Sequence, residues 1–480
     1  MNQAKLLING QWVEAQGGDR YEQRNPANFE DVVGSLARAT TEDVQQAISA
    51  AQAALPGWSN LPGPARGAIL EKAAQILDAR LDETAAGLTR EEGKTLAEAK
   101  GEVLRARDIL RYYAGEGWRV GGTVYPSNAP GELLYSKREA LGVVAVITPW
   151  NFPIAIPAWK IAPALAYGNT VVFKPARHGE LTAHALVQAL VDAGLPAGVL
   201  NFVTGSGAVI GDALVESPGI NGVSFTGSQV VGTQIYAKAI RNLTRVQLEM
   251  GGKNPTLVLN DADLDLAVSL AARSGFGLTG QACTATSRVI VQNGIANRFA
   301  QALSETARKW TVGNGLETST QMGPAVSGEQ LKTDLEYIQI GQQEGAQLLA
   351  GGTAEKGSGH FVLPTVFDHV QGNMRIAQEE IFGPVIGIIR VDTLEEGIAQ
   401  ANAIGFGLAA GVVTNDLKSA FAFANGVEAG VVKINEPTTG LALQAPFGGF
   451  KGSSANTFKE QGPAAIEFYT RTKTIYVGHG

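Results

Sequence analysis

The chain has 480 residues, more than one compact core usually holds, so we expect two or three domains. Hydrophobic residues make up 45% of it and charged residues 17%, a balance typical of folded globular proteins and not of disordered chains. The net charge of −7 argues against nucleic acid or an acidic membrane surface as the main partner, and no apolar run reaches the ~18–20 residues of a membrane span.

The chain contains one cysteine, Cys283, which excludes an intrachain disulfide and a multi-cysteine zinc site. The five histidines show no metal-binding spacing, so we assign no metal. The absence of disulfides fits a reducing compartment, and the segment from Met1 to Lys5 does not resemble a signal peptide. We therefore expect a cytoplasmic protein.

The first part of the chain is predicted to begin with a strand pair and to continue mainly as helices. Residues 6–13 indicate two strands joined by a turn at Asn9-Gly10. Helices are expected over residues 41–55, 64–80 and 81–114, and Gly93 breaks the last of them. Residues 115–131 then form a connection that contains glycine and proline.

From Leu141 onward, apolar runs alternate with helical stretches, which predicts a parallel, doubly wound sheet. The expected strands are residues 142–148, 170–173, 199–204 and 222–225, and the helices between them are residues 156–166, 180–193 and 208–216. A second alternating block contains strands at 256–259 and 288–291, helices at 262–274 and 297–309, and a terminal strand at 466–477.

Cys283 is a candidate nucleophile, because the small, flexible residues before it, Gly280 among them, would leave a thiolate open to substrate and to backbone N–H groups. Taken alone, a single cysteine is more often a small buried hydrophobic residue.

Two other residue types would complete such a site. Glu249 lies among apolar residues beside a glycine pair, where burial would raise its pKa and suit it to general-base work, although an internal glutamate is usually exposed or paired. Asn151 follows the first apolar strand, where its amide could donate to an oxyanion or simply form a turn.

Weaker signals point to a dinucleotide site. Gly227 and Ser228 follow a predicted strand and precede a helix, a place that favours a phosphate group, although the spacing is not G-x-G-x-x-G. Lys174 ends another strand, where it could reach ribose hydroxyls or lie in solvent.

Taken together, these segments resemble the aldehyde dehydrogenase superfamily over nearly the whole chain. The resemblance is carried by six motifs in the family's order and by the 34-residue separation of Glu249 and Cys283 (283 − 249 = 34). The motifs lie at residues 149–153, 225–228, 248–253, 280–283, 379–384 and 446–449.

The resemblance implies an α/β, aldehyde dehydrogenase-like fold of three parts. A Rossmann-like cofactor domain would comprise residues 1–117 and 139–250, and an α/β catalytic domain residues 251–440. A small β oligomerisation arm would comprise residues 118–138 and 464–480 and would serve a homodimer or homotetramer.

The resemblance also implies a role for each matching residue. Cys283 would be the nucleophile, Glu249 the base that activates the deacylating water, and Asn151 with the Cys283 backbone N–H the oxyanion donors. The implied cofactor-binding residues are Thr148, Pro149, Trp150, Lys174, Arg177, Gly227, Ser228, Glu380 and Phe382. Of these, Lys174 and Glu380 would bind the two riboses, Ser228 the pyrophosphate, and Phe382 would pack near the nicotinamide.

Two rival functions remain open at this point. Coenzyme A-acylating relatives cleave the thioester with a thiol, but they generally lack the glutamate that Glu249 matches. A non-catalytic protein on the same scaffold would have little reason to keep Cys283, Glu249 and Asn151 together.

Within the superfamily, residues 283–288 and 448–462 are similar to bacterial α-ketoglutarate semialdehyde (2,5-dioxovalerate) dehydrogenases, which implies a small acidic semialdehyde as the substrate. Arg107 and Arg111 share one face of a predicted helix, where one could meet a substrate carboxylate. The alternative is that they form a solvated basic face or interdomain ion pairs. Trp159 occupies a position at which succinate-semialdehyde-type relatives often carry an arginine, so an aromatic or neutral aliphatic aldehyde is the alternative substrate.

The expected cofactor is NADP, with NAD also usable. In many NAD-preferring relatives the position of Arg177 is a glutamate that binds the adenosine ribose and repels a 2′-phosphate. A guanidinium there removes the repulsion and offers a bidentate phosphate donor, unless it points into solvent and leaves the ribose to Lys174.

Overall fold

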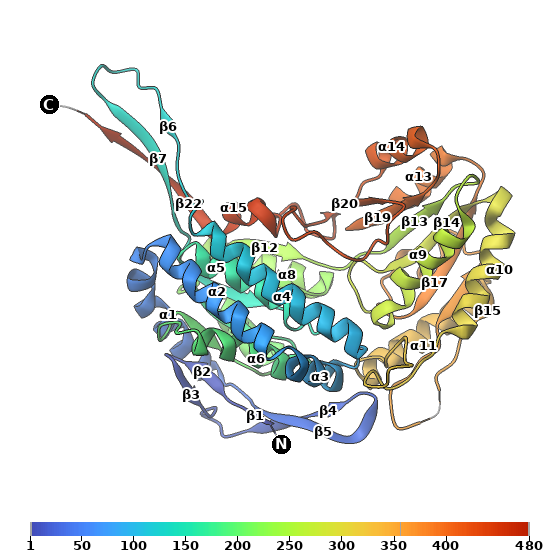
Figure 1. Cartoon of the computed structure of the whole chain (residues 1–480), viewed down its shortest axis with the longest axis horizontal. Coiled ribbons are helices and arrows are strands. Elements are labelled where there is room, and N and C mark those ends of the chain that lie inside the picture. Colours follow the sequence, from blue (N-terminus) through green and yellow to red (C-terminus); the bar gives the residue numbers. More distant parts are fainter. Residues whose placement is uncertain (1, 356, 479–480) are drawn as a thin grey trace.

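The computed structural model describes residues 2–355 and 357–478, and two seven-stranded sheets lie side by side in it (Figure 1). The strand order of the first sheet is β12-β11-β8-β9-β10-β2-β3. Its strands are β2 (Leu6–Ile8), β3 (Gln11–Val13), β8 (Val143–Ile147), β9 (Thr170–Lys174), β10 (Leu200–Phe202), β11 (Gly222–Thr226) and β12 (Arg245–Glu249). The five strands from β12 to β10 are parallel, and the β2–β3 hairpin adds antiparallel strands at one edge.

The predicted parallel sheet is therefore confirmed, and its apolar runs are explained by burial on both faces. Side chains alternate along a strand, so Val144 and Val146 of β8 enter one core, whereas Val143, Ala145 and Ile147 enter the other. The first core is covered by α2 (Gly63–Ala79), α3 (Leu81–Glu92), α4 (Leu96–Glu116), α5 (Ala155–Ala166) and α6 (Glu180–Asp192). The second core is covered mainly by α1 (Thr41–Asn60), α7 (Asp212–Val215) and α8 (Gln229–Ala239).

The second sheet has the order β15-β16-β17-β14-β13-β19-β20 and is parallel except for β15 at its edge. Its strands are β13 (Asn254–Val258), β14 (Thr286–Gln292), β15 (Gln347–Ala350), β16 (Thr365–Asp368), β17 (Val385–Val391), β19 (Ala409–Val413) and β20 (Val431–Ile434). One face packs on α9 (Leu264–Phe276) and α10 (Asn293–Lys309), and the other on α11 (Gly328–Gln343), α12 (Arg375–Gln378), α13 (Leu394–Asn402) and α14 (Leu417–Gly426).

Three smaller sheets complete the molecule. β1 (Asn2–Ala4), β5 (Asn28–Ala37) and β4 (Arg20–Asn25) form one, and β18 (Phe406–Gly407) pairs with β21 (Phe450–Lys451) in another. β6 (Val124–Tyr125), β7 (Leu133–Ala140) and β22 (Thr470–Val477) form an arm that projects from the body (Figure 1).

The C-terminal segment corrects one sequence prediction. Residues 466–469, predicted as the start of a strand, belong instead to the short helix α15 (Ala465–Tyr469). Phe468 and Tyr469 are buried in the first core, and this packing outweighs the strand preference of aromatic residues. Strand β22 begins only at Thr470 and pairs with Ala140 of β7 there; residues 479–480 of the predicted arm lie outside the described residues.

No helix in the described part of the chain is both long and apolar enough to cross a bilayer.

Candidate active site

A cavity of about 820 Å³ lies at the carboxyl ends of the parallel strands of the first sheet, where doubly wound folds bind ligands. Strands β8, β9, β11 and β12 each contribute residues to it at or just beyond their ends. Most of the residues predicted from the sequence line this cavity, namely Thr148, Pro149, Trp150, Asn151, Lys174, Gly227, Ser228, Cys283, Glu380 and Phe382.

Cys283 is carried by a turn with an unusual backbone. Leu278, Thr279 and Gly280 have φ values of 53°, 58° and 67°, so three consecutive residues are left-handed. At Gly280 only glycine fits, because a Cβ atom would collide with the Gly383 backbone. Glu98 anchors the turn by accepting a 2.8 Å hydrogen bond from the Leu278 N–H. The strain is thus held by surrounding contacts, as is common at functional sites.

The Cys283 thiol is partly exposed to the cavity, yet it is strongly biased toward its protonated form. Desolvation, followed by the charges of Glu380 and Glu249, raises the pKa of Cys283 to about 12. The backbone N–H groups of Thr284 and Cys283 act in the opposite direction. Both carboxylates therefore lie close enough to the sulfur to influence its proton.

The Asn151 side chain lies beside the cysteine loop. Its Nδ2 donates a 2.9 Å hydrogen bond to the Gln281 carbonyl oxygen, which leaves its second amide N–H for another acceptor. The Asn151 residue is buried. An amide N–H next to a thiol can stabilise an oxyanion that forms on a carbonyl attacked by that thiol.

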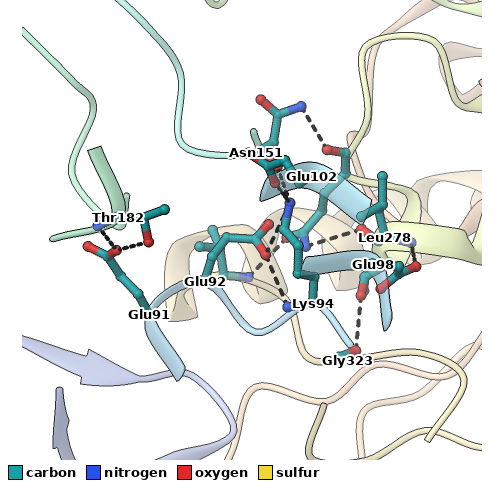
Figure 2. Close-up of polar contacts among 12 residues, drawn as sticks. Glu91, Glu92, Lys94, Glu98, Glu102, Asn151, Thr182, Leu278 and Gly323 are labelled. Carbon is teal, nitrogen blue, oxygen red and sulfur yellow. Dashed lines mark hydrogen bonds and ion pairs between the residues drawn. The ribbon is translucent and has the colours of Figure 1, made fainter. Parts of the chain in front are cut away.

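A buried ionic network holds the backbone around Asn151 (Figure 2). The Lys94 ammonium donates to the Asn151 carbonyl oxygen and to Glu102, both at 2.6 Å. Glu102 also accepts hydrogen bonds from the N–H groups of Ile154 and Ala155 at the start of α5. Sequence reasoning did not identify Lys94 or Glu102; the one local signal was the capping box of Thr95 and Glu98, which marks the start of α4.

Glu249 is the last residue of β12 and does not appear in the cavity lining. Its side chain is buried, and neither carboxyl oxygen has a hydrogen-bond partner among the described residues. Burial, and then the nearby charge of Glu460, raises its pKa well above the ordinary value of a glutamate. A Cβ atom at Gly448 would collide with this carboxyl group, so glycine is required there. A buried carboxyl group with a raised pKa is suited to accept a proton near neutral pH.

Glu380 lies on another wall of the cavity. It accepts a 3.0 Å hydrogen bond from the Gly252 N–H, and a side chain at Gly251 would collide with it. Desolvation raises the pKa of Glu380 to about 7. Phe382, two residues later, stacks edge-on against Trp150 with ring centroids 5.4 Å apart.

The cavity also has features that suit a dinucleotide. Ser228 caps α8, whose first-turn N–H groups favour a phosphate at this edge of the cavity. Lys174 is buried, its Nζ donates to the Pro175 carbonyl oxygen at 3.0 Å, and desolvation lowers its pKa. Ala176 lines the cavity, but its neighbour Arg177 does not appear in the lining. The Arg177 side chain is exposed, and its guanidinium lies 5.7 Å from the centre of the Tyr21 ring.

The structure corrects the placement of Arg107 and Arg111. Both lie outside the cavity and form ion pairs on the outer side of α4. Arg107 pairs with Asp78 at 2.7 Å and with Asp108 at 2.8 Å, and Arg111 approaches Glu71 and Asp78. Both side chains are thus engaged by acidic residues of α2 and α4.

Within residues 2–355 and 357–478, no group of three or more His, Cys, Asp and Glu side chains is arranged to hold a metal ion.

Comparison with known proteins adds independent information. The model of the aldehyde dehydrogenase family matches residues 12–475. The α-ketoglutaric semialdehyde dehydrogenase of Bacillus subtilis (strain 168) is 50% identical over 475 residues, which cover 98% of this chain and 97% of that protein. The 2,5-dioxopentanoate dehydrogenase of Saccharolobus solfataricus is 47% identical over 97% of this chain and 98% of that protein.

Solved structures agree with this assignment of the fold. The NAD-dependent aldehyde dehydrogenase of Sinorhizobium meliloti has a TM-score of 0.97 and 35% identity, and the match covers 99% of this chain and 95% of that one. An NADP dependent enzyme of E. coli has a TM-score of 0.96 and 37% identity over 99% and 98% of the two chains. Betaine aldehyde dehydrogenase of Staphylococcus aureus, solved with NAD+, also has a TM-score of 0.96, at 35% identity.

Proposed function

The chain belongs to the aldehyde dehydrogenase family, an enzyme family that oxidises aldehydes with a nicotinamide cofactor, and on this premise we propose that Cys283 is its nucleophile. The single observation that carries this proposal is that Cys283 and Asn151 line one cavity of about 820 Å³, where the Asn151 amide also donates a hydrogen bond to the Gln281 carbonyl oxygen of the cysteine loop.

In the proposed acylation, the Cys283 sulfur bonds to the aldehyde carbon and the thiol proton goes to a base. The carbonyl π electrons move to oxygen, which accepts hydrogen bonds from the free Asn151 amide N–H and from the Cys283 backbone N–H. A nicotinamide bound in the cavity would supply the acceptor for the hydride that leaves this carbon as the C=O bond re-forms. The carbon is thereby oxidised and remains on the sulfur as a thioester.

In the proposed deacylation, Glu249 takes a proton from water and the resulting hydroxide attacks the thioester carbonyl. The C–S bond breaks, the acid leaves, and the thiolate regains a proton. The buried, hydrogen-bond-free carboxyl group of Glu249 is suited to this task, because its raised pKa makes it a stronger base than an ordinary glutamate.

The residues of the cavity fit a nicotinamide dinucleotide. We assign the riboses to Lys174 and Glu380, the pyrophosphate to Ser228 and the start of α8, and the nicotinamide surroundings to Phe382. Thr148, Pro149, Trp150 and Gly227 complete the walls. This assignment rests on their shared cavity and on the capped helix terminus that points into it.

Within this site we propose a preference for NADP over NAD. Arg177 is exposed beside the cavity-lining Ala176, and its guanidinium has no ion pair among the described residues. It is therefore free to receive the 2′-phosphate, with the ammonium of Lys174 three residues earlier.

The proposed substrate is a small acidic semialdehyde such as α-ketoglutarate semialdehyde. The support is the 47–50% identity, over nearly full length, to three proteins named for that substrate. A preference for neutral aliphatic or aromatic aldehydes is the competing specificity, favoured by the aromatic pair of Trp159 and Phe447 near Cys283.

The test measures reduced cofactor at 340 nm for acidic semialdehydes, for aliphatic aldehydes of matched length and for benzaldehyde, with each cofactor. The proposal requires an acidic semialdehyde to have the highest kcat/KM. A ten-fold advantage for benzaldehyde or for the neutral aldehyde would overturn the substrate assignment. If turnover required added coenzyme A, the proposal that Glu249 activates water to cleave the thioester would be overturned.

We further propose the three-part division into a cofactor domain (1–117 and 139–250), a catalytic domain (251–440) and an arm (118–138 and 464–480). The family is commonly oligomeric, and the arm presents the exposed apolar side chains Val124, Leu133, Tyr476 and Val477. These side chains would lie at an interface of a homodimer or homotetramer.

A further inference from the structure

Arg105 occupies the face of α4 that is turned toward the active site. Glu98 and Glu102 of the same helix bind the cysteine loop and the start of α5, and Arg105 follows Glu102 by three residues. At ~1.5 Å per residue, Arg105 lies about 4.5 Å further along the same face. Its guanidinium donates a hydrogen bond to the Gln461 side chain, and α4 packs against α5.

The Arg105 guanidinium is mostly unpaired, unlike other buried arginines of the chain. Arg66, Arg245 and Arg288 each make three hydrogen bonds to backbone carbonyl oxygens. Arg105, which is half-buried, makes a single bond of 2.9 Å, from Nη2 to Gln461 Oε1, and no ion pair within the described residues. Desolvation lowers the pKa of Arg105, and the charge of Asp108 acts in the opposite direction. A carboxylate partner would stabilise the half-buried guanidinium.

Two more side-chain donors on segments that contact α4 are buried and without an acceptor among the described residues, namely Gln461 Nε2 and Trp159 Nε1. Gln461 also has φ 60° and ψ 167°, a backbone conformation otherwise nearly confined to glycine. The strained backbone holds the Gln461 amide against Arg105. An unsatisfied donor and local strain in the same residue are typical of a binding position.

A chain of contacts joins these donors to the reacting cysteine. The Trp159 ring packs against Phe447, with centroids 5.9 Å apart, and Phe447 exchanges two backbone hydrogen bonds with Glu460, the residue before Gln461. Cys283 packs against the cluster that contains Trp159 and Phe447. Arg105, Trp159 and Gln461 do not appear in the lining of the cofactor cavity.

We propose that Arg105, with the Gln461 amide and the Trp159 indole N–H, binds the distal carboxylate of the substrate while its aldehyde carbon meets Cys283. The inference rests on the proposed function and adds the group that selects a short, carboxylate-bearing aldehyde. A guanidinium can bind both carboxylate oxygens, and the two neutral donors fix their orientation.

The test is Arg105→Met, assayed with an acidic semialdehyde and with a neutral aliphatic aldehyde of the same length. Loss of charge-assisted hydrogen bonds should lower kcat/KM for the acidic substrate roughly ten- to a hundred-fold, mainly through KM. The neutral aldehyde should change less than about three-fold. Arg105→Lys should recover part of the loss, because it restores the charge without the planar donor pair. Glutarate, a dicarboxylate probe, should inhibit neutral-aldehyde oxidation in the parent and ten-fold more weakly in Arg105→Met.

Arg107→Met is the matched control, since Arg107 lies on the same helix but pairs with Asp78 outside the cavity; it should leave the substrate ratio unchanged. An equal loss for both aldehydes in Arg105→Met would assign Arg105 a purely structural role and overturn the inference, as would unchanged kinetics or unchanged glutarate inhibition. The proposed function fails by a different result, namely a parent enzyme that prefers the neutral aldehyde before any substitution is made.

Discussion

The ammonium of Lys94 donates a 2.6 Å hydrogen bond to the carbonyl oxygen of Asn151 and thereby links the start of α4 to the proposed oxyanion donor. Lys94, Glu92 and Glu102 are all buried, and Lys94 is the cation within this cluster. The position of the Asn151 amide is thus tied to a charged network and not only to the turn that contains it.

Replacing Lys94 by methionine should therefore damage both stability and catalysis. Removing one member of a buried ion pair typically costs about 3–5 kcal/mol, because the remaining carboxylate is left without a partner. Thermal unfolding should shift down by several degrees, and kcat should fall more than the affinity for the cofactor. Lys332→Met, at an exposed pair with Glu336, is the control and should be close to neutral. An unchanged melting temperature in Lys94→Met would show that the network contributes little.

Cofactor choice can be tested at Arg177. Arg177→Glu should lower kcat/KM for NADP by roughly ten- to a hundred-fold, since a charge-assisted hydrogen bond contributes about 1.5–3 kcal/mol and is replaced by repulsion. NAD should be affected far less. Arg177→Gln separates loss of attraction from added repulsion and should give an intermediate ratio. A parent that prefers NAD, or a ratio that does not move, would show that Arg177 does not contact the phosphate.

Asp334 provides a prediction about pH and stability. Desolvation raises its pKa to about 8, whereas an unfolded aspartate titrates near ~3.9. The folded state thus binds the proton more tightly, and the contribution of Asp334 to stability falls as pH rises from about 4 to 8. Asp334→Asn cannot ionise and should gain stability relative to the parent across this window, by at least about 1 kcal/mol at pH 8. Chemical denaturation at several pH values measures this difference. The exposed Glu305→Gln is the control, and a gain that shrinks with rising pH would contradict the account.

The arm can be tested through assembly. Leu133 and Tyr476 are 47% and 65% exposed in the single chain, which is unusual for large apolar side chains on a projecting sheet. The double substitution Leu133→Asp and Tyr476→Asp should convert the oligomer to a smaller species in sedimentation velocity, because charges at an apolar interface are costly. Leu417→Asp, at a residue 71% exposed on α14, should leave the mass unchanged. If both variants behave like the parent, the arm is not the interface.

Much of the central fold could be predicted from local patterns, because strands β8 to β11 of the first sheet are fully buried and appear as apolar runs between helices. The C-terminal segment could not: residues 466–469 have strand-like composition, but the pocket that receives Phe468 and Tyr469 is built by distant elements. The same limit applies to β4, whose polar sequence forms a strand by pairing with β5.

The candidate catalytic and cofactor residues were proposed because they lie in motifs similar to those of the family, and several of these motifs follow strand ends. The inward-facing arginine of α4 could not be identified in this way. Each residue turns a helix by ~100°, so Arg105 lies far around α4 from Arg107. Which face of α4 points inward depends on the packing of α4 against α5 and on the bonds of Glu102 to Ile154 and Ala155. Those contacts join segments that are distant in the sequence. Sequence spacing therefore showed that Arg107 and Arg111 share a face of α4, but not which face of α4 is turned toward the site.

The central claim is that Cys283 carries the acyl group and Glu249 promotes its hydrolysis. Mass spectrometry of Glu249→Gln, quenched in acid within seconds of mixing with NADP and an acidic semialdehyde, tests this most directly. The neutral amide of this variant cannot accept a proton from water, so a burst of about one reduced cofactor per active site should precede slow turnover. The quenched protein should be heavier by one acyl group, located on the Cys283 peptide and absent from Cys283→Ala. A Glu249→Gln enzyme that turns over at the parental rate without a burst, and shows no adduct on Cys283, would contradict the account.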